Sequence, residues 1–388
     1  MRIAIFDYTI VRNNAIGKCH LQILAELCRE HEFTVFAVRF ENPCPERIQW
    51  VRVPAPLRPQ ACLFLAFHFL APICFLLSRL RHRARFDIVQ VVESNVAFGD
   101  ISYSHFCHRE FLQCRWSQSG SRGLRGLLRW LDHWFRALSE SWTYRKAHKI
   151  VVPSQGLARE LAARYPFVGS KIQVLNNPVS VDDMDRPAAF DADRFRFQLG
   201  FSAQDIVLSF VALGHYERKG LPNLLDALRL CGHPDLKLVV VGGPPALISV
   251  YEKRVRSMHL ERNVVFAGMK PDVRPYLWAS DALILPSHYE VFPFAALEGA
   301  AAGLPLLATP LNGVEEFLRD GENGILMKTQ DAAAISQSLL RFARLPVEAR
   351  RALGSTARES VRRYSPALFT KAWSTVYKEA IRWANMPS

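Results

Sequence analysis

The chain has 388 residues, which suggests two domains, and its apolar and charged fractions of 49% and 22% are those of ordinary globular proteins. This composition excludes a disordered, fibrous or collagen-like protein. The 49 Lys and Arg against 36 Asp and Glu give a net charge of +13, so we expect an anionic partner such as a nucleic acid, a membrane surface or a phosphorylated substrate.

The eight cysteines are scattered along the chain without a Cys-x-x-Cys pair, so we expect neither a zinc nor an iron–sulfur site. Seven of them lie in the first 114 residues, mostly within apolar runs, which is typical of buried, reduced thiols in a cytosolic protein. Residues 1–6 read as a strand rather than as the basic start of a secretory signal. The sequence therefore favours a cytoplasmic protein.

The first half of the chain alternates short apolar runs with helical patterns. Continuous apolar strands that alternate with helices are typical of a parallel sheet covered on both faces. Between the first strand and the first helix, Gly17 is a candidate for close approach to a phosphate, although a plain strand-to-helix turn explains it equally well. A full Gly-x-Gly-x-x-Gly pattern does not occur there, which counts against a typical NAD enzyme. The expected strands are residues 2–6, 33–38, 87–92, 149–152 and 171–175.

Residues 61–77 are the only long apolar run, and their 17 residues fall short of the roughly 20 that span a bilayer as a helix. The run contains His68 and Pro72, four arginines follow it, and the strand at 87–92 comes soon after. This arrangement favours a core helix that also touches a membrane surface over a transmembrane span.

Two histidines, His105 and His108, follow a short expected strand in a polar cluster. Either is a candidate for a functional role, with His105 preferred, and the alternative is a structural histidine. Residues 109–149 then carry nine Lys and Arg, with Trp, Phe and Leu interleaved at helical spacing. Such a segment suits an anionic membrane interface, and equally a core helix with a solvated basic face. Nucleic acid would fit the charge, but we find no nucleic-acid-binding motif and expect no such partner.

The second half of the chain repeats the alternation after a polar stretch at residues 176–190. We expect the boundary between two α/β domains near residues 178–200. Two such domains would face one another across a cleft, with ligands at the carboxyl ends of the strands. The expected strands are 206–212, 236–241, 264–267, 282–285 and 305–308, and the expected helices are 221–230, 247–258, 273–278 and 292–302.

A basic turn at Arg218, Lys219 and Gly220 joins the first of these strands to its helix. Adjacent cations at the carboxyl end of a strand, beside a glycine that lets the backbone turn, can clamp a diphosphate. The alternative is a solvated basic turn.

Two glutamates, Glu290 and Glu298, lie eight residues apart where the strand at 282–285 leads into a helix. With Glu290 in the loop and Glu298 two helical turns further on, they would be about 12 Å apart, too far for the paired carboxylates of a glycosidase. The spacing suits an elongated ligand that offers a hydroxyl pair to each carboxylate, with a phosphate at the helix N-terminus between them. A ligand with a hydroxyl pair at each end and a phosphate group between them is a nucleotide sugar.

These residues resemble glycosyltransferase family 4, whose members are retaining enzymes of the GT-B fold. The family signature is Glu-x7-Glu followed by a Gly-Leu/Ile-Pro-Val-like strand, and it is matched by Glu290, Glu298 and the Gly-Leu-Pro at 303–305. The likeness also covers Lys219-Gly220 and residues 150–161 and 171–179. The basic turn and the basic first half are most similar to lipopolysaccharide-core and cell-envelope transferases.

The resemblance implies an α/β protein with two Rossmann-like, doubly wound parallel-sheet domains that face one another across a cleft. Residues 1–180 would form the acceptor-side domain, and a C-terminal helix at 366–388 would pack back on it. Residues 181–365 would form the nucleotide-sugar-binding domain.

The resemblance also implies roles for individual residues. Glu290 would contact the donor sugar near the reacting carbon and His105 would touch the same sugar, so both are expected catalytic residues. Two departures from the family pattern stand out: His215 replaces the arginine of a Gly-Arg-x4-Lys motif shortened by one residue, and the first loop has one glycine instead of a pair. The expected donor contacts are Glu298 with the ribose hydroxyls, Arg218 and Lys219 with the diphosphate, Gly17 with the phosphates, backbone near Met269 with the base, and Phe294 at the helix start.

The expected activity is retaining hexosyl transfer from a UDP- or GDP-sugar to a hydroxyl of a cell-envelope glycan or glycolipid, as in polysaccharide or lipopolysaccharide biosynthesis. Cationic side chains would replace a metal ion, so we expect no metal or other cofactor. Two other hypotheses stay open: a sugar-nucleotide epimerase or phosphorylase on the same fold, and a non-catalytic nucleotide-sugar-binding scaffold at a membrane surface. The expected location is cytoplasmic, with peripheral attachment to the inner face of the plasma membrane through residues 109–149.

Overall fold

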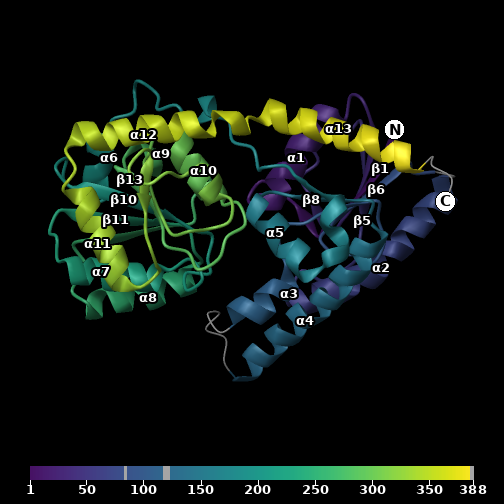
Figure 1. Ribbon diagram of the computed structural model, residues 1–388, viewed down its shortest axis with the longest axis horizontal. Helices are drawn as coiled ribbons and strands as arrows, with labels where there is room; N and C mark the ends of the chain where they lie inside the picture. Colours follow the sequence, from purple (N-terminus) through teal and green to yellow (C-terminus); the bar gives the residue numbers. More distant parts are fainter. Residues whose placement is uncertain (83–84, 117–122, 385–388) are drawn as a thin grey trace. The chain divides into compact units, whose positions relative to one another are not determined.

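The computed structural model describes residues 1–82, 85–116 and 123–384 (Figure 1). Its contacts divide the chain into two compact units. Unit 1 holds residues 1–178 together with the segment that begins at Pro366, and unit 2 holds residues 179–365. Each unit is a parallel β-sheet covered by helices, so the expected α/β architecture is confirmed.

The sheet of unit 1 has seven strands in the order β5-β3-β1-β6-β7-β8-β9, and all neighbouring strands are parallel. A separate short pair joins β2 to β4. The central strands are buried on both faces, which explains why their sequences are continuously apolar. The strands are β1 (Arg2–Phe6), β2 (Thr9–Ile10), β3 (Glu32–Ala37), β4 (Arg39–Phe40), β5 (Ile48–Arg52), β6 (Ile88–Val92), β7 (Ile101–Tyr103), β8 (Lys149–Val152) and β9 (Ile172–Val174).

Polar side chains cap the N-termini of two helices of unit 1. The Asn14 side chain accepts from the N–H groups of Ile16 and Gly17 at the start of α1, and Ser154 accepts from Leu157 at the start of α5. Helix α13 contacts α1. The helices are α1 (Ala15–Leu27), α2 (Gln60–His82), α3 (His108–Glu110), the π-helix η1 (Phe111–Arg115), α4 (Gly123–Lys146), α5 (Gln155–Arg164), the 3-10 helix η3 (Pro166–Lys171) and α13 (Pro366–Ala384).

The sheet of unit 2 has six parallel strands in the order β12-β11-β10-β13-β14-β15. In chain order this is 3-2-1-4-5-6, the arrangement of dinucleotide-binding folds. The strands are β10 (Ile206–Val211), β11 (Leu236–Val241), β12 (Val264–Gly268), β13 (Ala282–Leu285), β14 (Leu306–Ala308) and β15 (Gly324–Leu326). The helices are η4 (Asp182–Met184), α6 (Ala192–Gln198), α7 (Leu221–Cys231), α8 (Pro245–Ser257), α9 (Arg274–Trp278), α10 (Phe294–Ala301), η5 (Val314–Glu316), α11 (Ala332–Ala343), α12 (Val347–Val361) and η6 (Arg362–Tyr364).

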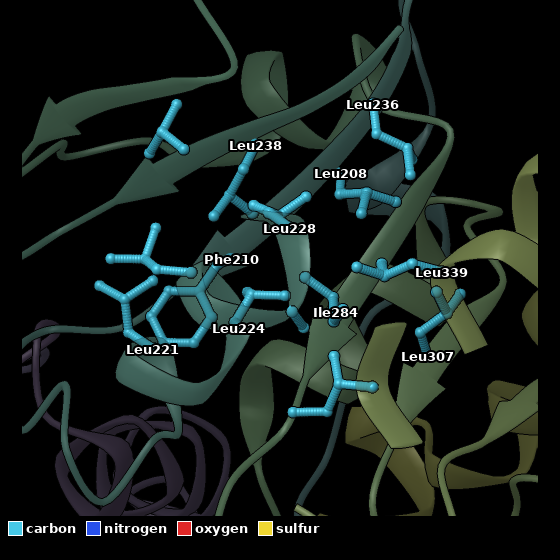
Figure 2. Close-up of a cluster of buried hydrophobic side chains, with 14 of the residues drawn as sticks. Leu208, Phe210, Leu221, Leu224, Leu228, Leu236, Leu238, Ile284, Leu307 and Leu339 are labelled. Carbon is cyan, nitrogen blue, oxygen red and sulfur yellow. The ribbon is translucent and has the colours of Figure 1, made fainter. Parts of the chain in front are cut away.

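Successive side chains of β10 point to opposite faces of this sheet and contribute to the hydrophobic core on each face. Leu208 and Phe210 pack on the face covered by α7 and α11, where Leu224 and Leu339 meet them (Figure 2). Val207 packs on the opposite face with residues of α6 and α9. Burial on both faces holds the sheet rigid, so the loops at its carboxyl edge start from fixed positions.

Several elements differ from the sequence-based expectations. Strand β5 was not expected, because its exposed edge position leaves Ile48 as its only fully buried side chain. Helix α2 is longer than the predicted 61–77, and only 28% of its most apolar stretch is buried. The segment therefore packs in the core along one face only, through residues such as Phe64 and Phe67, and its expected contact with a membrane surface stays a prediction. All eight cysteines are unpaired, but only Cys19, Cys28 and Cys107 are buried.

Candidate functional site

The strand order of unit 2 changes direction between β10 and β13. Loops that follow two such strands diverge to opposite sides of the sheet, and ligands of open α/β sheets bind in the space between them. Here the two loops are residues 212–220 and 286–293. They carry the basic turn and the first glutamate of the sequence motif.

Backbone contacts hold these two loops together. The His288 N–H donates to the Arg218 carbonyl oxygen at 2.8 Å. Gly220 has a φ of +78°, and a Cβ at this position would lie 2.0 Å from the Pro286 carbonyl oxygen. Only glycine permits both the left-handed backbone and the close approach. The glycine of the basic turn therefore fixes the distance between the two loops.

The side chains of the two loops meet in a buried cationic–anionic cluster. The Lys219 ammonium forms an ion pair and hydrogen bond with Glu290 Oε1, and Arg218 Nη1 lies 4.0 Å from Glu290 Oε2. The Lys219 and Glu290 side chains are 15% and 8% exposed, and that of Arg218 is 30% exposed. Arg218 also donates to the Tyr289 carbonyl oxygen at 2.8 Å. The structure thus brings together three of the predicted residues.

The cluster fixes the charge on Glu290. Burial alone would raise the pKa of its carboxyl, but the nearby Lys219 and Arg218 charges outweigh burial and the net pKa is lowered. The Ser287 hydroxyl also donates to Glu290 Oε1, at 3.0 Å. Thr309, which follows β14, donates in turn to the Ser287 carbonyl oxygen at 2.8 Å. Glu290 is therefore an ionised hydrogen-bond acceptor whose orientation is set by three elements.

Helix α10 begins four residues after Glu290. No side chain caps its N-terminus, and no acidic residue lies in its first turn. The positive end of the helix dipole favours an anion there. Phe294 is the first residue of the helix, and half-buried Glu298 follows one turn later. The helical spacing expected between the two glutamates is wrong, because residues 290–293 are not helical.

Met269 lies farther along the same edge of the sheet. It follows β12, which is separated from β10 by β11. The Met269 side chain is half exposed, and Gly268 turns the backbone there with a φ of +72°. The three elements that follow β10, β12 and β13 thus place the predicted donor residues of unit 2 along the carboxyl edge of one sheet.

Gly17 lies in unit 1, at the third position of α1. A Cβ at this position would lie 2.4 Å from the Val11 carbonyl oxygen. Its N–H group donates to the capping Asn14 side chain. The packing against Val11 accounts for the glycine by itself, which is what a plain strand-to-helix turn requires.

His105, also in unit 1, is buried just beyond the end of β7. Burial is the main cause that lowers the pKa of its ring to about 3, so the imidazole is neutral at physiological pH. Its Nε2 atom is buried and has no hydrogen-bond partner among the described residues. The ring packs edge-on against Tyr103, with 4.3 Å between the ring centroids.

Sequence reasoning missed Glu93, which follows β6 at the point where the strand order of unit 1 changes direction. Glu93 has a φ of +50°, uncommon for a residue with a side chain. Its Oε2 lies 3.5 Å from His108 Nε2, and His108 Nδ1 lies 2.8 Å from His133 Nδ1. Burial alone would raise the pKa of Glu93, but His108 outweighs it and the net pKa is lowered. A carboxylate directly after a buried strand was the available signal.

Metal ligands are not clustered in the described residues. Within residues 1–82, 85–116 and 123–384, no group of three or more His, Cys, Asp or Glu side chains could hold a metal ion. The chain contains two Asp-x-Asp sequences, at 183–185 and 191–193. Both have structural roles, because Asp185 pairs with Arg358 and Asp191 caps α6.

Comparison with known proteins assigns each half of the chain to a family. Residues 19–183 match the family model "Glycosyltransferase Family 4", and residues 191–360 match "Glycosyl transferases group 1". The D-inositol 3-phosphate glycosyltransferase of Acidothermus cellulolyticus is 30% identical over 221 residues, which cover 53% of this chain and 48% of that protein. The chain spans about half the length of this and other curated relatives that it matches.

Solved structures share the fold. WaaG, a glycosyltransferase involved in lipopolysaccharide biosynthesis, superposes with a TM-score of 0.75 at 19% identity, over 95% of this chain and 98% of WaaG. HepE of Anabaena, solved in complex with UDP-glucose, superposes with a TM-score of 0.73 at 16% identity, over 98% of this chain and 100% of that chain. Both domains and the strand order therefore lead to one assignment: the chain belongs to the glycosyltransferases of the GT-B fold.

Proposed function

We propose that this protein is a retaining glycosyltransferase that moves a sugar from a UDP- or GDP-sugar to a hydroxyl of a cell-envelope glycan or glycolipid. The observation that carries the proposal is the cluster of Arg218, Lys219 and Glu290 where the strand order of unit 2 changes direction. Two cations and an ionised carboxylate at this edge suit a ligand that has both a diphosphate and sugar hydroxyls.

In the proposed reaction, the bond between the anomeric carbon and the diphosphate oxygen breaks while a bond to the acceptor oxygen forms on the same face. The acceptor proton passes to the leaving diphosphate. Arg218, Lys219 and the N-terminus of α10 stabilise the negative charge that grows on the diphosphate, which is the dominant contribution to catalysis. Because these cations are fixed before the reaction, no metal ion is required.

The remaining roles in the proposal concern the orientation of the donor. Ionised Glu290 accepts hydrogen bonds from the donor sugar. The role expected for His105, which lies in unit 1, stays a prediction. Glu298 holds the ribose hydroxyls, while Phe294 begins the helix beneath the diphosphate. Backbone groups near Met269 read the base.

The comparisons support the donor and acceptor classes in the proposal. HepE was solved with UDP-glucose and shares the fold over its whole length. WaaG is described as a lipopolysaccharide enzyme, which supports a cell-envelope acceptor. The unpaired cysteines fit the proposed cytoplasmic location.

Saturation-transfer NMR with UDP-glucose, UDP-galactose, UDP-N-acetylglucosamine and GDP-mannose tests the donor class. We expect binding of at least one donor, and calorimetry should show that Arg218→Ala with Lys219→Ala weakens it at least about tenfold. Glu290→Gln should retain the fold and abolish transfer. Failure of all four donors to bind would overturn the proposal, and epimerised sugar formed without an acceptor would favour an epimerase instead.

A further inference from the structure

Helix α2 presents apolar side chains to solvent along one side. These residues recur every three or four positions, so they lie on one face of the helix, and their exposed fractions run from 44% to 69%. The opposite face packs into the core of unit 1 through Phe64, Phe67 and Ala71. The exposed apolar residues are Leu65, Phe69, Ile73, Leu76, Leu77 and Leu80.

Helix α4 presents a second apolar stripe of the same kind. Its residues also recur at helical spacing and are 43% to 73% exposed. The other side of α4 is buried through Arg136, Ser139, Glu140 and Thr143. The exposed apolar residues are Leu124, Leu127, Leu128, Leu131, Trp134, Leu138 and Trp142.

The two helices are neighbours within unit 1. The rings of Phe64 on α2 and Phe135 on α4 have centroids 5.5 Å apart, and the Arg136 guanidinium lies 4.3 Å from the Phe64 ring centroid. Figure 1 shows α2 and α4 running alongside one another. We call the exposed apolar residues of both helices the two-helix face. Thirteen large apolar side chains on adjacent helices exceed what single, scattered surface residues explain.

Among the described residues, the exposed charges on the two helices have one sign. Helix α2 contains no Asp or Glu, and exposed Arg79, Arg81 and Arg85 lie at and beyond the end of its apolar stripe. Helix α4 contains two carboxylates: Glu140 is fully buried, and Asp132 is paired with Arg136. No carboxylate in the described part of either helix is exposed. An apolar face with cations at its border matches the acyl chains and anionic headgroups of a lipid surface.

We propose that the two-helix face docks unit 1 on the surface of an anionic lipid bilayer, with both helices lying in the interface plane. This inference goes beyond the proposed transfer reaction and does not depend on it. A transmembrane position for α2 is disfavoured, because it would expose Phe64, Phe67 and Ala71 of the core. A symmetric contact with a second copy is the competing explanation, and the sedimentation experiment below distinguishes it from a lipid surface.

Vesicle co-sedimentation of the full chain tests the inference. We expect binding to vesicles of phosphatidylcholine mixed with phosphatidylglycerol, and weaker binding to phosphatidylcholine alone or at high salt. The triple change Phe69→Gln, Ile73→Gln and Leu77→Gln should lower the partition coefficient at least about tenfold, because it removes apolar burial. Arg79→Glu with Arg81→Glu should lower only the preference for anionic vesicles.

Matched variants in unit 2 provide the controls. Phe197, Leu230 and Val250 are as exposed as the residues changed in α2, so their replacement by Gln should leave vesicle binding unchanged. Arg256→Glu with Arg351→Glu makes the same change in net charge as the arginine pair of α2. The inference is wrong if the control variants lower binding as much as the α2 variants. It is also wrong if the chain does not bind either kind of vesicle. A dimer in sedimentation that the α2 triple variant dissociates would then show that the two-helix face contacts a second copy.

Discussion

The ion pair between Lys219 and Glu290 contributes little to the net free energy of unfolding. Both side chains are largely removed from water, and the attraction between buried opposite charges roughly offsets their lost hydration. Its value lies in geometry, because it places an ionised carboxylate and an ammonium group at the carboxyl edge before any ligand arrives. The neighbouring Arg218 guanidinium is held by the Tyr289 carbonyl oxygen and keeps a larger exposed surface for a ligand.

A double-mutant cycle measures this coupling. Lys219→Met should destabilise the protein by about 3 kcal/mol, because it leaves Glu290 buried without its main counter-charge. The double variant Lys219→Met with Glu290→Gln should be clearly more stable than the sum of the single changes predicts. Urea unfolding provides the free energies.

The exposed ion pair of Arg341 with Asp320 is the control for this cycle. Its side chains are 50% and 44% exposed, so Arg341→Met should cost less than about 1 kcal/mol. Additive effects of Lys219→Met and Glu290→Gln would contradict a coupled pair.

At the scale of the elements, the turn between β10 and α7 depends on Gly220. The backbone at this glycine is left-handed, and the Pro286 carbonyl oxygen occupies the position of a side chain. The turn therefore packs directly against the loop after β13. Displacement of either loop would separate Arg218 and Lys219 from Glu290.

Gly220→Ala should destabilise the protein and weaken UDP binding together. The matched control is Gly232→Ala, because Gly232 has a φ of +59° but open space where its Cβ would lie. The control should cost about 1 kcal/mol from the left-handed backbone alone, whereas Gly220→Ala should cost at least about 2 kcal/mol more. Calorimetry with UDP and urea unfolding separate the two effects. Equal costs would show that the contact with Pro286 is unimportant.

Helix α13 is the element that returns the end of the chain to unit 1. It buries Trp373 completely, with the Tyr103 ring centroid 4.9 Å away, and Tyr377 donates a hydrogen bond to Gln90 at 2.5 Å. Strands β6 and β7 therefore depend on a segment nearly three hundred residues farther along the chain.

Trp373→Ala should destabilise unit 1 by about 3 kcal/mol or more, because it leaves a large cavity. Hydrogen exchange should accelerate in β6 and β7 of unit 1, but not in β10 and β11 of unit 2. Leu368→Ala, on the exposed side of the same helix, should leave both units unchanged. Equal acceleration in both units would contradict the assignment of α13 to unit 1.

At the scale of the whole molecule, buried neutral histidines make stability depend on pH. Burial is the main cause that lowers the pKa of His105 to about 3 and of His133 to about 2, from an ordinary value of 6.5. Between the lowered pKa of the folded state and the ordinary value of 6.5, the unfolded chain binds more protons than the folded chain. Stability therefore falls as the pH falls below 6.5. Above pH 6.5 both histidines are neutral in both states and this dependence disappears.

We predict a loss of about 1.4 kcal/mol per pH unit for each such histidine between pH 6 and about 4. His105→Gln should reduce the slope of stability against pH by about 1.4 kcal/mol per pH unit, which corresponds to one proton, even if it also lowers stability overall. Ser104→Ala, a buried neighbouring change without a titrating group, should alter stability and leave the slope unchanged. Urea unfolding across this pH range measures both. An unchanged slope in His105→Gln would show that this ring is not a buried neutral group.

Local patterns were sufficient to predict most strands and the fold class. Long apolar strands such as β1 and β10 are buried on both faces, and that burial is visible in their composition. The basic turn and Glu290 could be placed at strand ends for the same reason. Strand β5 was missed, because its position at the edge of the sheet leaves most of its side chains unburied and its sequence is not a continuous apolar run. The extent of the exposure of α2 could not be predicted either, because an apolar helix has the same composition in a core and at a surface.

The sequence by itself determined two parallel-sheet domains and the positions of Arg218, Lys219 and Glu290 in the loops after strands, because these follow from local periodicity. Only the tertiary structure decided that Lys219 and Glu290 form a buried pair and that Glu93 joins His108 and His133. These contacts join residues far apart in the chain, so they depend on strand order. Strand order arises from the packing of whole elements, which no local pattern records.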